Sequence, residues 1–393
     1  MEQFISDVMK LREKVNKLYI YGIGLYGRTT YQTLSKYEIK IDGFMVTSNR
    51  EHEKVWGIPV FETKDIISDQ IGIVLGLNKF NTIEVLEYLK QNNFDMSKVI
   101  YRNEFVRNAG RDCNLDQNPM IEITTRIGCK VNCYYCPQSV LLNSYFKNDK
   151  NRKMEMDIND FKTCLDKLPI NCDIIFCGMS EPLLNSQCIK MMQMACATGR
   201  RVELFTTLVG AKMEDIDKII SMPLNLVTLH VADKFGHAQI PVSQEYYEMV
   251  EKMISAKRKD GTPLVNNCSA QEEADEQIKK ICEGRCEIVT VLHDRAGNLE
   301  SKGIDIMTQK GLQGKISCSF CSSKMNRNIL LPDGTVLLCC MDYGMKHSLG
   351  NLLEDTYDEI MNSQEMQKVK HGINGDMSLD ILCRNCSQAH EIR

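Results

Sequence analysis

The sequence predicts an α/β fold made of two successive runs of alternating strands and helices, followed by a segment of different character. Short apolar stretches alternate with amphipathic stretches between residues 17 and 101, and again between residues 120 and 294. Beyond Gly297 the alternation ends and cysteines become frequent. A chain of 393 residues is too long for one core, and these observations predict domains at residues 1–112, 113–305 and 306–393.

The first run predicts a small doubly wound domain with a parallel sheet. Helical patterns separate its expected strands, which are residues 17–22, 39–46, 71–77 and 98–101. Periodicity fades between Asn103 and Cys113, so the domain is expected to end there.

The turn after the first of these strands carries a GxGxxG pattern, formed by Gly22, Gly24 and Gly27. Glycines at such a turn let a phosphate approach the backbone and the start of the next helix. A dinucleotide site also needs an acid at the end of the second strand, where this chain has Thr47. With "WGIPVF" at residues 56–61, the domain resembles the Rossmann-like nucleotide-sugar-binding module of bacterial sugar acyltransferases. A binding domain and a purely structural one both remain open.

The second run predicts a complete or partial barrel of six βα units. Its expected strands are residues 120–126, 173–178, 201–207, 225–233, a weak one within 263–270, and 287–294. The helical patterns between them are residues 158–168, 186–198, 213–222, 245–259 and 273–284. In such barrels the chemistry gathers on the loops after the carboxyl ends of the strands.

Composition excludes several classes of function. A formal net charge of −4 gives no reason to expect nucleic acid or an anionic membrane as a partner. No apolar run approaches the roughly 20 residues that cross a bilayer, and the N-terminus lacks the apolar core of a signal peptide. We therefore expect a cytoplasmic protein.

The chain contains 18 cysteines, which is the outlier in its composition. In a reducing compartment such a number points to metal or redox chemistry rather than to disulfides. Some cysteines lie singly in apolar patterns and are expected to be buried core residues: Cys164, Cys172, Cys188, Cys196 and Cys282.

Three cysteines follow the first strand of the second run with the spacing C-x3-C-x2-C: Cys129, Cys133 and Cys136. A closed zinc site would need a fourth ligand nearby, and the next cysteine is Cys164. The order also differs from that of a ferredoxin run. Three thiolates on a [4Fe-4S] cluster would leave one iron open to a small molecule. A zinc loop is the alternative.

This motif, with Tyr135 before the third cysteine, resembles the radical S-adenosylmethionine (SAM) superfamily. The resemblance implies that Cys129, Cys133 and Cys136 hold a [4Fe-4S] cluster whose open iron is chelated by SAM. It also implies reductive cleavage of SAM to a 5′-deoxyadenosyl radical, which abstracts hydrogen from a C–H bond. An electron donor such as flavodoxin or ferredoxin would be the partner.

A second stretch, after the expected strand at 173–178, resembles the Gly-Gly-Glu-Pro motif of the same superfamily. It reads Gly178, Met179, Ser180, Glu181 and Pro182, so one family glycine is replaced by serine. The resemblance implies that backbone carbonyls and the Glu181 carboxylate bind the ammonium group of SAM. Any strand-to-helix loop with a proline at the helix start is the alternative interpretation.

The tail resembles the shortened auxiliary-cluster domain, called twitch, of the SPASM/twitch radical SAM enzymes. The matching residues are Cys321, Gly334, Cys339 and the pair Cys383-x2-Cys386. The resemblance implies one auxiliary [4Fe-4S] cluster held by these four cysteines. A zinc ribbon is the alternative.

Two further cysteines of the tail, Cys318 and Cys340, are alternative ligands or a redox-active thiol, and Cys318 is the candidate for a catalytic thiol. Arg295 follows the sixth strand at the expected barrel mouth, where it could bind an anionic group or a developing ketyl oxygen. His230, on the fourth strand, is expected to be a satisfied interior residue.

By analogy with twitch enzymes, we expect a dehydrogenase or epimerase that acts on a sugar or a nucleotide-linked sugar. One alternative is a SPASM-type maturase that modifies a ribosomally made peptide or protein. Another, from a different class, is a non-catalytic iron–sulfur electron carrier, but such a carrier has no use for a SAM ammonium site.

Overall fold

The computed structural model describes residues 2–23, 25–47, 54–55, 57–68, 70–77, 79–101, 118–259, 261–299, 305–318, 320–321 and 324–392. The chain forms two compact units, Met1–Leu115 and Asp116–Arg393. The expected end of the first domain, between Asn103 and Cys113, lies outside the described residues.

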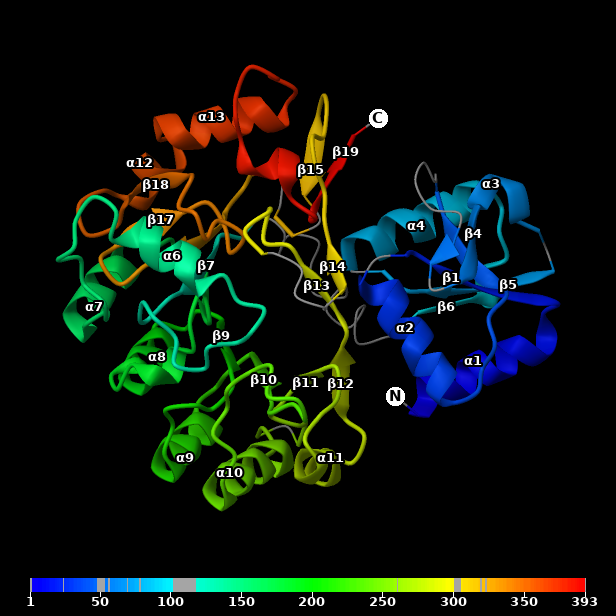
Figure 1. Ribbon diagram of the computed structural model, residues 1–393, viewed down its shortest axis with the longest axis horizontal. Coiled ribbons are helices and arrows are strands. Elements are labelled where there is room, and N and C mark those ends of the chain that lie inside the picture. Colours follow the sequence, from blue (N-terminus) through cyan, green and yellow to red (C-terminus); the bar gives the residue numbers. More distant parts are fainter. Residues whose placement is uncertain are drawn as a thin grey trace. The chain divides into compact units, whose positions relative to one another are not determined.

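The first unit contains a six-stranded sheet with the order β3-β4-β2-β1-β5-β6 (Figure 1). All neighbours are parallel except β3 and β4. The strands are β1 (Lys17–Tyr21), β2 (Gly43–Val46), β3 (Lys54–Val55), β4 (Ile58–Glu62), β5 (Ile71–Leu75) and β6 (Val99–Tyr101). The helices are α1 (Glu2–Lys14), α2 (Leu25–Lys36), α3 (Thr63–Ile66), α4 (Lys79–Gln91) and the 3₁₀ helix η1 (Met96–Lys98).

Alternate residues of β1 enter two different cores. Leu18 and Ile20 pack with buried residues of α1, whereas Tyr19 and Tyr21 pack with buried residues of α4. Because successive strand residues point to opposite faces, a strand buried on both sides must be apolar throughout. The doubly wound architecture expected for this unit is therefore what the structure contains.

The glycines after β1 have a packing reason of their own. Gly22 has φ +104°, and a Cβ there would lie 2.6 Å from a methyl carbon of Leu77. A Cβ on Gly27 would overlap the Gly22 carbonyl oxygen, and one on Gly76 would lie 2.5 Å from the Gly27 Cα atom. Close packing of the first turn of α2 against the ends of β1 and β5 thus accounts for Gly22 and Gly27 without a ligand. Gly24 lies outside the described residues.

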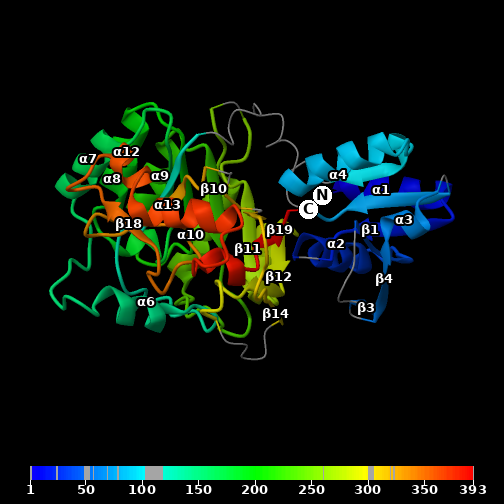
Figure 2. The same cartoon turned by 90° about the horizontal axis from the view of Figure 1, so that it is seen from above.

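The second unit is built on a nine-stranded sheet with the order β12-β11-β10-β9-β8-β7-β16-β17-β18. The first six of these are mutually parallel, and each pairs with its neighbour in sequence. They are β7 (Met120–Ile123), β8 (Asp173–Phe176), β9 (Val202–Thr206), β10 (Leu226–His230), β11 (Asn267–Gln271) and β12 (Cys286–Val289). Figure 2 shows β10, β11 and β12 following one another in this sheet.

Helices connect these strands, and those from α7 to α11 follow one another along the outer edge of this unit in Figure 1. They are α6 (Gln138–Tyr145), α7 (Ile158–Lys167), η3 (Pro182–Leu184), α8 (Cys188–Ala197), α9 (Met213–Ser221), α10 (Gln244–Ser255) and α11 (Glu276–Cys282). One apolar core runs between helices and sheet and includes Phe161, Phe176, Met191 and Leu204. Six parallel strands with helices on one side form the expected partial (β/α)6 barrel.

The C-terminal segment extends the same sheet. Strand β16 (Arg327–Leu330) pairs in parallel with β7, and β17 (Thr335–Leu337) and β18 (Ser348–Asn351) follow in antiparallel order. The remaining elements are β13 (Val291–His293), β14 (Asp305–Met307), β15 (Ile316–Cys318), α12 (Tyr357–Met361), α13 (Gln364–Ile373), η4 (Leu382–Asn385) and β19 (Ala389–Glu391). This pairing brings the cysteine-rich tail beside the first barrel strand.

One expected strand, residues 287–294, is divided in two. β12 pairs with β11, whereas β13 pairs with β14, so the sheet partner changes at Thr290. The alternating pattern continues across this position, so the sequence alone gave no sign of the break.

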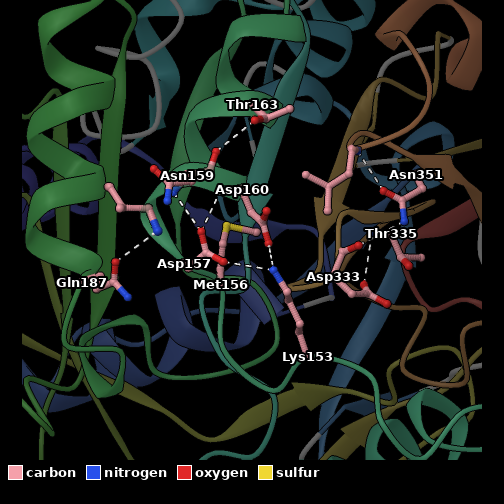
Figure 3. Close-up of polar contacts among 12 residues, drawn as sticks. Lys153, Met156, Asp157, Asn159, Asp160, Thr163, Gln187, Asp333, Thr335 and Asn351 are labelled. Atoms are coloured by element: carbon pink, nitrogen blue, oxygen red, sulfur yellow. Dashed lines mark hydrogen bonds and ion pairs between the residues drawn. The ribbon is translucent and has the colours of Figure 1, made fainter.

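Helix α7 begins at a well-formed cap that fixes the segment before it. Asp157 accepts hydrogen bonds from the Asn159 amide at 2.9 Å and the Asp160 amide at 3.0 Å (Figure 3). The Ile158 amide donates to Gln187 Oε1 at 3.1 Å, which ties this helix start to the segment before α8.

Among the described helices, none combines the length and the apolar character that crossing a bilayer requires.

Candidate active site

A cavity of about 430 Å³ lies in the second unit at the carboxyl ends of the parallel strands. Cys177 follows β8, Thr207 follows β9, and His230 ends β10, and all three line the cavity. This is the end of a parallel sheet where loops can surround a ligand.

The loop after β7 brings Cys129, Cys133 and Cys136 to the wall of this cavity. Two backbone hydrogen bonds hold the loop against the segment after β10: Tyr134 N to His237 O at 2.7 Å, and Gln239 N to Val131 O at 2.8 Å. The loop is therefore positioned by the fold before any ligand binds.

Burial makes the Cys129 and Cys133 thiols poor anions on their own. Burial, and after it the neighbouring Cys136 and Cys129, raise the pKa of the Cys133 thiol to about 12. Burial also raises the pKa of Cys129. Three adjacent thiolates need a cationic centre, so the donor set fits an iron–sulfur cluster, which Cys thiolates hold.

Tyr135 also lines the cavity and is half-buried. Burial raises the pKa of its hydroxyl, and the neighbouring Cys133 raises it further. The phenol is therefore neutral and can act as a hydrogen-bond donor next to the cysteine loop.

The Glu181 side chain is held inside the cavity wall by four hydrogen bonds. Its Oε1 accepts from Thr206 Oγ1 at 2.6 Å and the Leu183 amide at 3.1 Å. Its Oε2 accepts from the Thr207 amide at 2.6 Å and the Thr207 hydroxyl at 2.7 Å. Burial raises the pKa of this carboxyl, and the bonds from Thr206 and Thr207 oppose that effect. The Glu181 amide donates to Cys129 Sγ at 3.4 Å, so the two motifs touch.

The rest of the Gly-Met-Ser-Glu-Pro stretch is fixed by the end of β7. Gly178 has φ +66°, and a Cβ there would overlap Thr124 Oγ1. The Met179 amide donates to Thr124 Oγ1 at 3.0 Å. Ser180, the residue that departs from the family motif, donates from its hydroxyl to Arg126 O at 2.6 Å. Pro182 accepts from Thr125 Oγ1 at 2.9 Å through its carbonyl.

Asn185 is a positioning residue that the sequence did not single out. Its buried amide group donates to Thr125 O at 2.9 Å and to Met156 O at 2.8 Å, and its Oδ1 accepts from the Gln187 amide. It joins the end of this stretch to β7 and to the start of α7.

Residues that lie far apart in sequence also line the cavity. Arg295 and Cys340, both named from the sequence, line the cavity. Glu122, Arg327 and Tyr343 line it too, and the sequence did not single them out. The signal for Glu122 and Arg327 was a charge within the short apolar strands MIEI and RNIL.

His230 faces the cavity, where it keeps accessible surface although protein surrounds it. Its Nδ1 lies 2.9 Å from Ser269 Oγ. Burial, and then the nearby Arg295, lower its pKa to about 4. His230 is therefore neutral at physiological pH, and its ring lines the ligand space.

The tail gathers its cysteines near one another. Cys321, Cys339, Cys383 and Cys386 are all buried. Cys318 Sγ accepts hydrogen bonds from the Phe320 and Cys321 amides, each at 3.3 Å. Cys318 therefore lies beside Cys321 and, within the described residues, does not line the cavity, whereas Cys340 does.

Hydrogen bonds of this kind, from backbone amides to sulfur, stabilise thiolates that bind a metal or a cluster. Cys386 Sγ likewise accepts from the Gln388 amide at 3.4 Å. The tail thus presents two C-x2-C pairs, Cys318 with Cys321 and Cys383 with Cys386, together with Cys339. Within the part of the chain that the structure describes, no three Cys, His, Asp or Glu side chains are placed to hold a single metal ion.

Residues 321–387 match the family model of SPASM, an iron–sulfur cluster-binding domain. The expectation of a SPASM-type tail that binds an iron–sulfur cluster is confirmed by this match. No curated protein matches the chain.

Several solved structures are similar to parts of this chain. BtrN in complex with AdoMet and 2-DOIA is 18% identical over 68% of this chain and 92% of its own, with a TM-score of 0.44. Streptococcus suis SuiB bound to precursor peptide SuiA is 11% identical over 79% of this chain and 82% of its own, with a TM-score of 0.43. The enzyme anSMEcpe with bound AdoMet and Cp18Cys peptide is 14% identical over 68% of this chain and 89% of its own, with a TM-score of 0.41. At these values they do not decide a substrate.

Proposed function

We propose that this chain is a radical SAM enzyme that abstracts hydrogen from a C–H bond of a sugar or nucleotide-linked sugar. One observation carries the proposal. The three-cysteine loop and the Glu181 carboxylate face one cavity and are joined by the bond from the Glu181 amide to Cys129 Sγ, at 3.4 Å. An electron carrier needs the thiolates but not a buried carboxylate next to them.

Different residues of the cavity bind the cluster and SAM. Cys129, Cys133 and Cys136 hold the barrel [4Fe-4S] cluster, and Glu181 receives the ammonium group of SAM. When bound, these cofactors supply a 5′-deoxyadenosyl radical after one-electron reduction by a donor such as flavodoxin or ferredoxin. Met179, Ser180 and Pro182 keep the backbone of the motif in place through hydrogen bonds with Thr124, Arg126 and Thr125.

The apolar part of the wall keeps water from a reactive radical. Val131, Ile175, Phe205, Ile240 and Leu292 contribute to it. Exclusion of water is what prevents such a species from being quenched before it reaches the substrate.

The auxiliary cluster is expected at Cys321, Cys339, Cys383 and Cys386. Cys318 lies among these residues, so it is placed to support or ligate the cluster. The cavity thiols outside the three-cysteine loop are Cys177 and Cys340. Cys177 donates to Glu122 Oε2 at 3.3 Å, so Cys340 is the better candidate for a thiol that returns hydrogen to a substrate radical.

The sugar class is supported by the doubly wound first unit, whose sequence resembles a nucleotide-sugar-binding module, and by analogy with twitch enzymes. Gly22 and Gly27 do not add to this support, because packing explains them.

The test is anaerobic reconstitution with iron and sulfide, followed by incubation with SAM, dithionite and separate panels of nucleotide sugars and peptides. We expect 5′-deoxyadenosine to form faster with a nucleotide sugar. Stimulation by peptides alone would replace the sugar class with the maturase alternative. In D2O, an epimerase incorporates one solvent deuterium at the reacting carbon, whereas a dehydrogenase yields a ketone without it.

A further inference from the structure

Two guanidinium groups line the cavity. Arg327 begins β16, opposite Met120 of β7, and Arg295 lies in the turn after β13. Arg295 was expected at the cavity from its position in the sequence, but Arg327 has no assigned role.

Arg327 is fixed in place while part of its hydrogen-bonding capacity is unused. Its guanidinium lies 3.6 Å from the centre of the Phe320 ring, and its Nε lies 3.5 Å from Glu122 Oε1. The second distance is an ion-pair contact that is too long for a normal hydrogen bond. Within the described residues the buried Nε has no hydrogen-bond partner. The Phe320 ring and Glu122 therefore orient the planar fork of a residue that lines the cavity.

Arg295 has weaker contacts still. Its Nη1 lies 3.9 Å from the Met341 sulfur, and its guanidinium lies 6.0 Å from the Tyr343 ring centre. No carboxylate of the described residues forms an ion pair with it. The residue has φ +51°, a left-handed conformation that is uncommon for arginine, so the turn holds it in a specific place.

Of the described carboxylates of the cavity wall, only Glu122 forms an ion pair with either of these two arginines. Glu181 is occupied by its four donors, and Asp233 accepts from the amides of Phe235, His237 and Ala238. Glu122 remains, with Oε1 beside Arg327 and Oε2 bonded to Cys177. Within the described residues Arg295 thus contacts no carboxylate, and Arg327 shares Glu122 with Cys177. A buried charge is costly unless it is paired.

We propose that Arg295 and Arg327 form a binding site for one singly charged oxyanion group of the substrate, either a carboxylate or a phosphodiester. This assignment rests on the proposed function, which makes the cavity the substrate site. One such group would pair with the Arg295 guanidinium, which contacts no carboxylate of the described residues. Guanidinium forks bind carboxylate and phosphate oxygens in pairs, so the site also fixes orientation.

The same oxyanion chemistry has a second source, the carboxylate of SAM. The two sources are separable because SAM is present in every reaction, whereas a substrate group is not. If the arginine binds the substrate anion, its variant keeps the normal affinity for SAM. If the arginine binds the SAM carboxylate, its variant binds SAM more weakly.

The experiment compares Arg295→Gln and Arg327→Gln with Arg200→Gln in reconstituted protein. Arg200 is a matched control because its guanidinium donates to the carbonyls of Leu165, Leu168 and Pro169, away from the cavity. Acetate and dimethyl phosphate are titrated by calorimetry without reductant. SAM is titrated separately, by the change it causes in the electron paramagnetic resonance spectrum of the reduced cluster.

We expect each cavity variant to lose roughly tenfold or more in affinity for at least one of the two anions, because a charge-assisted hydrogen bond is lost. We expect SAM affinity to stay unchanged in both cavity variants. In Arg200→Gln we expect the affinities for SAM and for both anions to stay unchanged. Equal anion affinity in all proteins overturns the proposal, as does a loss of SAM affinity without a loss of anion affinity. If either glutamine variant does not fold, Arg295→Lys and Arg327→Lys replace it, with a smaller loss expected. Absence of 5′-deoxyadenosine in wild type would count against the proposed function only.

Discussion

Thr207 holds Glu181 with two hydrogen bonds to one oxygen: its amide donates to Oε2 at 2.6 Å and its hydroxyl donates to the same atom at 2.7 Å. The amide bond persists whatever residue follows β9, but the hydroxyl bond is specific to Ser or Thr. An ionised carboxylate offers about four acceptor positions, and protein donors fill all of them here. A bound ammonium must therefore share or replace a hydroxyl donor, and the Thr206 and Thr207 hydroxyls are the ones that can rotate away.

Replacing Glu181 by Gln removes the negative charge and keeps the shape. We expect SAM affinity to fall roughly 10- to 100-fold, because a hydrogen bond to a charged group is lost. Thr207→Ala should have a smaller effect, since the amide bond remains. Binding is measured by the spectral change of the reduced cluster on adding SAM. Glu203→Gln is the control, because Glu203 is also buried on β9 but pairs with Arg201. Unchanged affinity in Glu181→Gln would exclude the carboxylate from the SAM site.

Asn185→Ala tests how the motif is positioned. The change leaves the buried Met156 carbonyl without its donor, at about 1–3 kcal/mol for an unsatisfied group, and removes one of two donors from the Thr125 carbonyl, which keeps the Met156 amide. The midpoint of chemical denaturation should therefore fall clearly. Asn362→Ala, which removes an exposed amide bonded to Asp358 O, should change it little. An equal decrease of the denaturation midpoint in the two variants would show that Asn185 does not position the motif.

Local patterns allowed the barrel strands and the cysteine loop to be predicted, because each depends on residues close in sequence. Only part of the Glu181 environment could be predicted from the sequence. The carboxylate was recognised by its motif, but the donors Thr206 and Thr207 belong to another strand, and nothing local marks them. Asn185 was missed for the same reason, since its partners Thr125 and Met156 lie on separate segments.

The pairing of β16 with β7 could not be predicted from the sequence. It places Arg327 beside Glu122 although 204 intervening residues separate them. The sheet position of the tail depends on which edge of β7 is free after the barrel forms. A charge inside each short apolar strand was the signal available, and it indicates burial with a partner without identifying that partner.

Metal analysis separates the two expected cluster sites. In the variant with Cys129, Cys133 and Cys136 all changed to Ala, we expect about four irons per chain to remain after reconstitution, since the tail thiols are intact. Cys383→Ala with Cys386→Ala should remove iron while leaving the spectral response to SAM. Finding zinc in the tail of the triple variant would reject an auxiliary iron–sulfur cluster there.

The stability of the second unit should fall in mild acid because of a buried histidine. His293 lies between Ser387 Oγ, 3.1 Å away, and the Gln388 amide group, and burial, followed by Arg295, lowers its pKa to about 4. Between pH 6.5 and about 4 the unfolded chain binds the proton and the folded chain does not, so stability is lost as pH falls through this window. His293→Gln should reduce this loss by about 1–3 kcal/mol, measured by urea denaturation at several pH values. Replacement of the exposed His371 by Gln should leave this loss of stability unchanged.

Gly178→Ala separates backbone strain from a steric clash. Gly178 has φ +66°, and its new Cβ would overlap Thr124 Oγ1, which also accepts the Met179 amide. Gly199 has φ +76° with nothing within 4 Å of its Cβ position, so Gly199→Ala carries strain alone. The left-handed conformation costs a non-glycine residue about 1–2 kcal/mol, and we expect that loss at both positions. Only Gly178→Ala should in addition displace the Met179 to Glu181 segment and weaken SAM binding. Equal thermal shifts and normal SAM affinity in both variants would show that β7 does not fix the motif.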